Sequence, residues 1–175
     1  MLTTILIALI GLIVLLLLAA AVMPREYTLA SSVVINRPQA TVFDYIRHIK
    51  NQERYSKWVM ADPNLHIVYT GTDGEPGFTS TWKSELKNVG QGAQEITKLF
   101  PGQGYEVEIR FEKPFKGTSY AVAMTEPMPD GQTMVTTTFH TSMPFPMNAM
   151  APLLKKMLLK DMDETSRNLK KQLEQ

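Results

Sequence analysis

The chain has 175 residues, of which 20% are charged and 44% hydrophobic, and this length leaves room for one domain with a short appendage. Its formal net charge of +1, without any block of basic residues interleaved with aromatic ones, argues against a nucleic-acid partner. The absence of cysteine excludes disulfides, thiolate nucleophiles and cysteine-ligated metals.

An unbroken run of eighteen apolar or small residues, from Ile5 to Val22, is the most specific signal in the sequence. As a helix it is just long enough to cross a hydrocarbon layer of about 30 Å. A cleaved signal peptide is the alternative, because Ala19-Ala20-Ala21 offers an A-x-A site, but the basic n-region is missing and the run exceeds the usual length of about 7–15 residues. We therefore expect a retained transmembrane anchor over residues 1–24 and a globular domain over residues 25–175.

The charges that flank this run indicate an orientation. Arg25 and Arg37 follow the run, whereas only the terminal amine precedes it, and basic residues favour the cytoplasmic side. We expect a single-pass protein of a bacterial inner membrane with its domain in the cytoplasm. Pro24 ends the helix and leaves almost no linker, so the domain should sit against the bilayer surface.

Alternating apolar and polar residues predict a first strand over Tyr27–Ile35. A helical stripe that begins at Ala40 predicts a short helix to about Lys50, with Pro38 as its start signal. A second short helix or turn is expected over Asn51–Trp58.

Six further strand-like runs follow, separated by turn signals rich in glycine, proline and aspartate. They span residues 65–70, 78–86, 93–100, 105–112, 119–126 and 133–141. The alternation is cleanest in Tyr105–Glu112, which is typical of a strand with one wet and one buried face. Consecutive antiparallel strands with helices at their edges predict an α+β fold with the helices on one face of the sheet.

The last stretch, from about Met147 to Gln175, has apolar residues at spacings of three, four and seven, which place them on one stripe of a helix. At ~1.5 Å per residue this helix would be roughly 40 Å long. Its first half is the richer in apolar side chains, and we expect that half to lie across the sheet. The stripe consists of Met150, Leu153, Leu154, Met157, Leu158, Met162, Leu169 and Leu173.

Several soft motifs occur in a characteristic order. They are Val33–Ile46, Asn51, Ser56-Lys57-Trp58, Gly77, Trp82, Gly90-Gln91-Gly92, Phe111–Gly117 and Gly131–Thr136. In this order they resemble the SRPBCC superfamily, which includes the polyketide cyclase/dehydrase, START-like and birch-pollen-allergen-like proteins. The resemblance covers about Tyr27 to the C-terminus and leaves only the anchor outside.

This resemblance implies a helix-grip fold, in which a curved antiparallel sheet of about six to seven strands wraps a long C-terminal helix and leaves a cavity between them. It does not imply one activity, because members bind lipids, sterols or plant hormones, cyclise polyketides, or assist chaperones.

The sequence contains none of the common catalytic or phosphate-binding motifs, so no catalytic residue is assigned and no cofactor is expected. His48, His66 and His140 fall on separate elements without ligand spacing, which argues against a metal site. Strand alternation also turns His140 away from the face that carries Val135 and Phe139.

Aromatic residues are the better functional candidates, although a solid core is the alternative explanation for each of them. The hollow fold that the resemblance implies makes ten residues candidates for a hydrophobic cavity wall. They are Trp58, Tyr69, Trp82, Tyr105, Phe111, Tyr120, Phe139, Leu154, Met157 and Leu158. Ser80, Ser84 and Thr137 lie on the same strand faces and would supply a few hydrogen bonds to a ligand.

The leading hypothesis is membrane-anchored binding or transport of a hydrophobic small molecule, such as a lipid, in this cavity. A cyclase/dehydratase-like enzyme that uses Tyr69, Tyr120 or His140 is one alternative. A membrane-tethered interaction or chaperone-assisting module is another. The expected partners are the hydrophobic molecule and the membrane, contacted through residues 5–22, while the ligand and the oligomeric state stay open.

Overall fold

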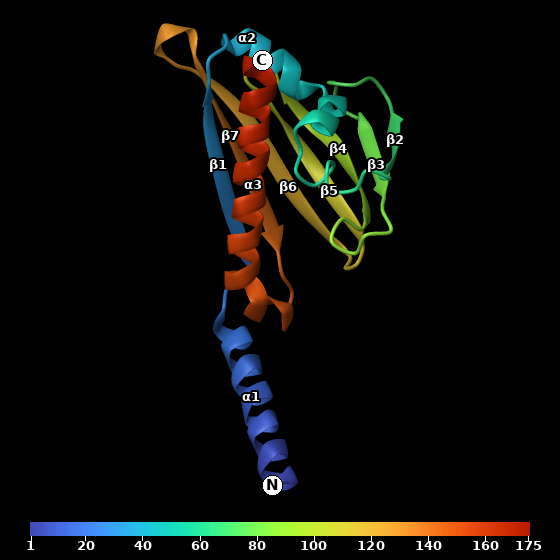
Figure 1. Ribbon diagram of the computed structural model, residues 1–175, viewed down its shortest axis with the longest axis vertical. Coiled ribbons are helices and arrows are strands. Elements are labelled where there is room, and N and C mark those ends of the chain that lie inside the picture. The colour runs from blue at the N-terminus through green and yellow to red at the C-terminus, as the bar shows by residue number, and fades with distance from the viewer.

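The computed structural model describes residues 1–175, apart from the side chain of Leu2. Three α-helices and three short 3-10 helices frame a seven-stranded sheet (Figure 1). The helices are α1 (Leu2–Val22), α2 (Gln39–Arg47), η1 (Ile49–Arg54), η2 (Pro129–Gly131), η3 (Met147–Met150) and α3 (Ala151–Glu174). The strands are β1 (Glu26–Ile35), β2 (His66–Thr70), β3 (Thr79–Lys83), β4 (Gln91–Phe100), β5 (Gly104–Lys113), β6 (Gly117–Pro127) and β7 (Thr133–Ser142).

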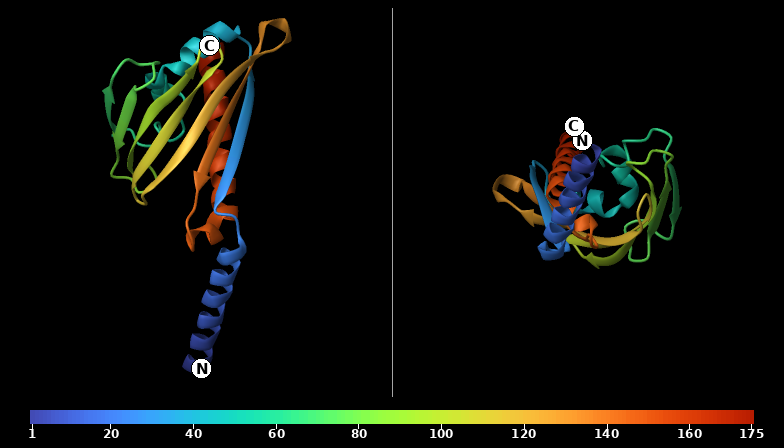
Figure 2. Two further views of the ribbon diagram at one scale, coloured as in Figure 1. Left: turned by 180° about the vertical axis from the view of Figure 1, so that it is seen from behind. Right: turned by 90° about the horizontal axis from the view of Figure 1, so that it is seen from below.

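The sheet is antiparallel throughout, with the strand order β1-β7-β6-β5-β4-β3-β2. Strands β2 to β7 follow one another as sequential neighbours, and β1 pairs with β7 at the opposite edge. The sheet curls around the side on which α3, α2 and η1 lie (Figure 2). This arrangement is the α+β fold predicted from the order of the elements, and it has the helix-grip form that the resemblance implied.

The long C-terminal helix packs chiefly along β1. Several of its attachments are polar. Ser31 donates a hydrogen bond to Asp163 over 2.7 Å, and Lys170 donates to the carbonyl oxygen of Val34 over 2.6 Å. At its C-terminal end, Glu174 accepts a 2.6 Å bond from the backbone N–H of Asn36. Because these bonds hold α3 at one edge of the sheet, the helix does not sink onto the middle strands.

The core lies under the second half of α3, where Leu169 and Leu173 pack with residues of the sheet, α2 and η1. The prediction that the first half carries the buried stripe is wrong for three residues. Met150, Leu153 and Met157 have relative exposures of 52%, 60% and 53%. The reason is that η1 and α2 cover only the far end of the helix, so its first turns have a protein neighbour on one side alone (Figure 1).

The N-terminal helix α1 projects from the end of the domain at which α3 begins (Figure 1). Its side chains from Thr3 to Leu18 are exposed, and by length and composition the helix can cross a membrane. The fully buried Asn148 in η3 joins its last turn to the domain. The side-chain amide of Asn148 donates to the carbonyl oxygens of Ala20, over 2.6 Å, and Met23, over 3.0 Å.

Candidate functional site

A partly open cavity of about 350 Å³ lies between the concave face of the sheet and α3. Its wall is mostly apolar. The lining residues are Gln52, Tyr55, Ser56, Trp58, Val59, Leu65, Ile67, Ser80, Trp82, Asn88, Val89, Gln94, Tyr105, Val107, Ile109, Phe111, Ala121, Ala123, Val135, Thr137, Phe139, Leu158, Met162, Thr165, Ser166 and Leu169.

Two features of the fold keep this space open. The first is the attachment of α3 along β1, which leaves the helix away from the middle strands. The second is the small size of the inward side chains on β6, where Ala121 and Ala123 line the cavity. Alanine side chains are too short to reach α3 from the centre of the sheet, and the aromatic residues lie towards its sides. The space below the helix therefore stays unfilled by side chains.

The tryptophan on β3 forms a broad part of the wall. Trp82 meets Phe111 in an edge-to-face contact with ring centroids 6.0 Å apart, and its indole N–H donates to the carbonyl oxygen of Val89 over 3.3 Å. Gly92 lies opposite on β4, and a Cβ atom there would stand 2.6 Å from a carbon of the Trp82 ring. The glycine therefore lets the ring lie flat across the neighbouring strand.

The side of the cavity next to η1 is polar. Ser80 and Gln94 are cross-strand partners of β3 and β4, and the amide of Gln94 donates to the side-chain oxygen of Gln52 over 2.8 Å. Tyr55 and Tyr105 stand beside this pair. Burial raises the pKa of the Tyr105 phenol, and burial followed by the neighbouring Tyr105 raises the pKa of Tyr55 well above its usual range.

We expect Tyr55 and Tyr105 to stay protonated when ordinary phenols ionise near pH 10. Because their folded-state pKa values are raised, the stability that they contribute is present below about pH 10 and is lost as the pH rises further. A spectrophotometric titration of the phenolate absorbance, followed beside circular dichroism, should show these two protons leaving only with unfolding. Ionisation of all six tyrosines of the still folded protein would contradict this.

The structure brings six of the ten sequence-predicted residues together on the cavity wall. They are Trp58, Trp82, Tyr105, Phe111, Phe139 and Leu158. Of the three polar candidates, Ser80 and Thr137 also line the cavity, whereas the hydroxyl of Ser84 bonds to Asp62 outside it. That these residues contact a ligand stays a prediction.

The other four predicted residues lie outside the cavity. On β2, the ring of Tyr69 stacks on Phe78 at 5.8 Å between centroids and its hydroxyl donates to Glu53. Tyr120 is on the outer face of the sheet, where its hydroxyl bonds to Glu108 over 3.2 Å.

The remaining two residues belong to α3. The helix is rotated about its axis so that neither side chain faces the cavity. Leu154 packs in a small separate cluster that contains Tyr27, Met143 and Ala151. Met157 is exposed.

The prediction missed the polar residues Gln52, Tyr55 and Gln94. Gln94 could have been predicted from strand alternation, because it points to the same face of β4 as Gly92 and the buried Ile96. Gln52 and Tyr55 carry no periodic signal, since they lie in and directly after a 3-10 helix whose direction only the folded chain defines.

The histidines serve structural roles or lie on the surface. His140 faces outward from β7, 3.2 Å from the hydroxyl of Thr28, as strand alternation predicted. His48 donates through Nδ1 to the carbonyl oxygen of Asp44 over 2.7 Å, at the end of α2. Within the described part of the chain, no group of three or more potential metal ligands is present.

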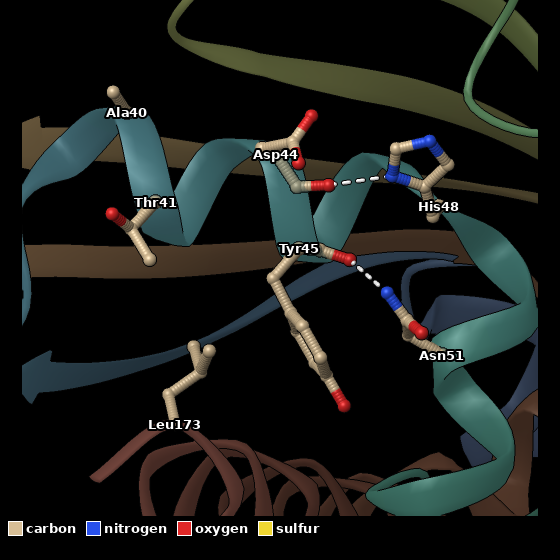
Figure 3. A pocket seen from close by; sticks show the side chains of 7 residues that line it. All are labelled: Ala40, Thr41, Asp44, Tyr45, His48, Asn51 and Leu173. Atoms are coloured by element: carbon tan, nitrogen blue, oxygen red, sulfur yellow. Dashed lines mark hydrogen bonds between the residues drawn. The ribbon is translucent and has the colours of Figure 1, made fainter.

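A second depression lies between α2 and the end of α3, and it is open to solvent (Figure 3). Its polar groups mainly satisfy the backbone at the end of α2. Besides His48, the amide of Asn51 donates to the carbonyl oxygen of Tyr45 over 2.8 Å. The Asp44 carboxylate is paired with Arg47 at 2.8 Å. The Tyr45 hydroxyl has no partner among the described residues, but the depression is shallow and open to solvent, so the apolar cavity under α3 is the better candidate.

An antiparallel sheet that grips a C-terminal helix around an apolar hollow defines a helix-grip protein. Residues 27–174 match the family model described as polyketide cyclase/dehydrase and lipid transport, and the chain belongs to this family. No curated protein sequence gave a significant match.

Solved structures with the same fold are distant in sequence. A hypothetical protein, jhp0584, from Helicobacter pylori superposes with a TM-score of 0.62 at 14% identity, over 84% of this chain and 88% of that one. The crystal structure of Ara h 8.0201 gives 0.53 at 15% identity, over 82% and 98%. The Aha1 dimer from Colwellia psychrerythraea gives 0.55 at 18% identity, over 85% and 96%. At these identities the likeness concerns the fold alone.

Proposed function

We propose that this chain binds, and in doing so transports, a hydrophobic small molecule in the cavity under α3 while α1 anchors it in a membrane. In this proposal residues 1–24 form the anchor and residues 25–175 form the binding domain. The observation that carries the proposal is the cavity of about 350 Å³ with its largely apolar wall. Sites for small molecules usually have volumes of about 300–1,000 Å³ and are lined mainly by apolar and aromatic side chains.

The contact between α1 and the domain supports a retained anchor over a cleaved signal peptide. Cleavage after Ala21 would remove the Ala20 carbonyl oxygen to which the buried Asn148 amide donates. The amide would keep its bond to Met23, but the loss of one of two bonds by a buried polar group still costs on the order of 1 kcal/mol. The domain thus contains a buried residue that makes one of its two amide hydrogen bonds to the helix that a signal peptidase would release.

The surface around the end of α1 also supports membrane association. Phe145, Met150 and Leu153 are exposed apolar side chains in the connection to α3 and its first turn, at the end of the domain from which α1 projects (Figure 1). Lys155 and Lys156 follow directly, which gives this surface the mixture of apolar and basic groups typical of a lipid interface. The proposed location, the cytoplasmic face of a bacterial inner membrane, rests on Arg25 and Arg37.

An enzymatic role finds less support. Tyr69, Tyr120 and His140, the residues considered for it, lie outside the cavity. Among the described residues that line it, the ionisable side chains are Tyr55 and Tyr105, phenols that are neutral near pH 7 and whose pKa burial raises further. A neutral phenol can orient a substrate, but it is a poor general base at this pH.

The test uses the full chain, expressed in bacteria and purified from washed membranes. We expect it to resist carbonate extraction, to carry the mass of residues 1–175, and to release a bound hydrophobic molecule in native mass spectrometry from nanodiscs. A mature protein that lacks residues 1–21 would overturn the anchor. A protein that has no bound molecule and takes up none from a panel of lipids would overturn the binding role.

A further inference from the structure

We infer that the ligand is an uncharged amphiphile, whose hydrogen-bonding head, a hydroxyl or carbonyl group, lies against Gln52 and Gln94 while its apolar tail occupies the rest of the cavity. This inference rests on the proposed function and deepens it by naming the ligand class. It excludes fatty acids and phospholipid head groups from the interior of the site.

The first step concerns charge. Among the described lining residues there is no aspartate, glutamate, lysine, arginine or histidine. An ionised group that leaves water without a partner of opposite charge is strongly disfavoured and is usually neutralised instead. A carboxylate in this cavity would meet no cation, and an ammonium group would meet no anion.

The second step concerns the polar side next to η1. The bond from Gln94 to Gln52 uses one amide donor and one oxygen lone pair. A glutamine side chain offers two donors and an oxygen with two lone pairs, so the pair retains both donor and acceptor capacity. Ser80 stands opposite Gln94 in the strand register and also lines the cavity. Amides and hydroxyls match a hydroxyl or carbonyl group, which can donate or accept but carries no charge.

The third step concerns the remaining wall. Phe111, Phe139 and Leu158 come from β5, β7 and α3 and line the cavity away from η1. Apolar surface of this kind stabilises a hydrocarbon by roughly 25 cal/mol per Å² removed from water. The wall away from η1 also contains Asn88, Thr137, Thr165 and Ser166, but the hydroxyls of Thr165 and Ser166 already bond to the backbone N–H of Lys57 and to Ser31. A polar cluster beside η1 and a mostly apolar remainder together describe an amphiphile with a compact neutral head.

The experiment compares dodecanol, dodecanoic acid and dodecane, each brominated at the chain end, for quenching of the fluorescence of the full chain in nanodiscs. The readout reports on the cavity directly, because both tryptophans of the chain, Trp58 and Trp82, line it. Affinities are referred to the free probe concentration in water, where the carboxyl group has its ordinary pKa, because burial in the bilayer itself would raise that pKa.

We expect the alcohol to bind on the order of 100-fold more tightly than the acid at pH 7. The reason is that the acid must enter in its protonated form, and a carboxyl group with an ordinary pKa of about 4.3 is almost wholly ionised at that pH. The difference should shrink about tenfold for each pH unit down to pH 5, a range over which the lining phenols Tyr55 and Tyr105 stay neutral. Equal or tighter binding of the acid at pH 7 would overturn the inference.

The variant Gln94→Leu tests the position of the head. It should lower the affinity for the alcohol about tenfold and leave that for the hydrocarbon unchanged, and the hydrocarbon also reports that the cavity is intact. Gln91→Leu, on the same strand but outside the cavity lining, is the matched control and should change neither. An unchanged alcohol affinity in Gln94→Leu would overturn the assignment of the head. If none of the three probes quenches, the proposed binding function fails instead.

Discussion

Replacing Ala121 by phenylalanine should abolish ligand uptake. Ala121 lines the cavity from β6, next to Val107 of β5 and Phe139 of β7 in the strand register. A phenyl ring at this position points into the space that a ligand would occupy, and a cavity of about 350 Å³ cannot hold both. Because no protein side chain fills this space, the new ring should cost little stability, in contrast to an insertion into a filled core. The measurement is uptake of brominated dodecanol by tryptophan quenching in nanodiscs.

The matched control for this variant is Ala30→Phe. Ala30 is exposed on the outer face of β1, so the same substitution adds the same bulk without entering the cavity. It should bind as the unchanged protein does. Undiminished uptake by a folded Ala121→Phe protein would mean that the ligand binds elsewhere.

Replacing Phe78 by alanine should cause the largest loss of stability of any single change considered. Phe78 has a relative exposure of 1%, is the largest of the fully buried side chains, and stacks on Tyr69. Removing a buried phenylalanine side chain typically lowers the free energy of unfolding by about 3–5 kcal/mol. For a chain of this size such a loss lowers the melting temperature by on the order of 10 °C. Thermal unfolding followed by near-UV circular dichroism in detergent measures it.

Phe115→Ala makes the same chemical change on the surface. Phe115 lies between β5 and β6 with a relative exposure of 65%, so its removal should alter the free energy of unfolding by no more than about 0.5 kcal/mol. Equal effects of the two substitutions would contradict the assignment of Phe78 to the core.

The fold was predictable because its signals are local. The alternation in Tyr105–Glu112 and the turn residues between the strands led to seven antiparallel strands, and Pro38 marked the start of α2 as predicted. Strand ends were less accurate, since residues 78–86 were expected to be extended and β3 covers only Thr79–Lys83. The chain leaves the sheet there because Ser84 turns to bond with Asp62.

Residues of the candidate site could be predicted only where they lie on a regular strand. Trp82, Phe111 and Phe139 obey the period of two and line the cavity. The prediction that Met157 and Leu154 line the cavity was wrong, because helical periodicity gives the angles between side chains but not which of them face the sheet. The prediction for Tyr69 was wrong for another reason. Its side chain is on the inner face of the sheet, but it lies on an edge strand next to η1, where the core is solid.

The bond between Asn148 and the last turn of α1 has a consequence for how a ligand could travel. With α1 in a bilayer, this bond couples the orientation of the domain to that of the anchor. The domain therefore does not reorient freely, as it would on a flexible linker. If the domain carries a ligand as proposed, a carrier fixed in this way cannot diffuse to a distant membrane. Under the proposed function, its ligand would enter from the bilayer that holds α1, or leave to an acceptor that comes to that bilayer.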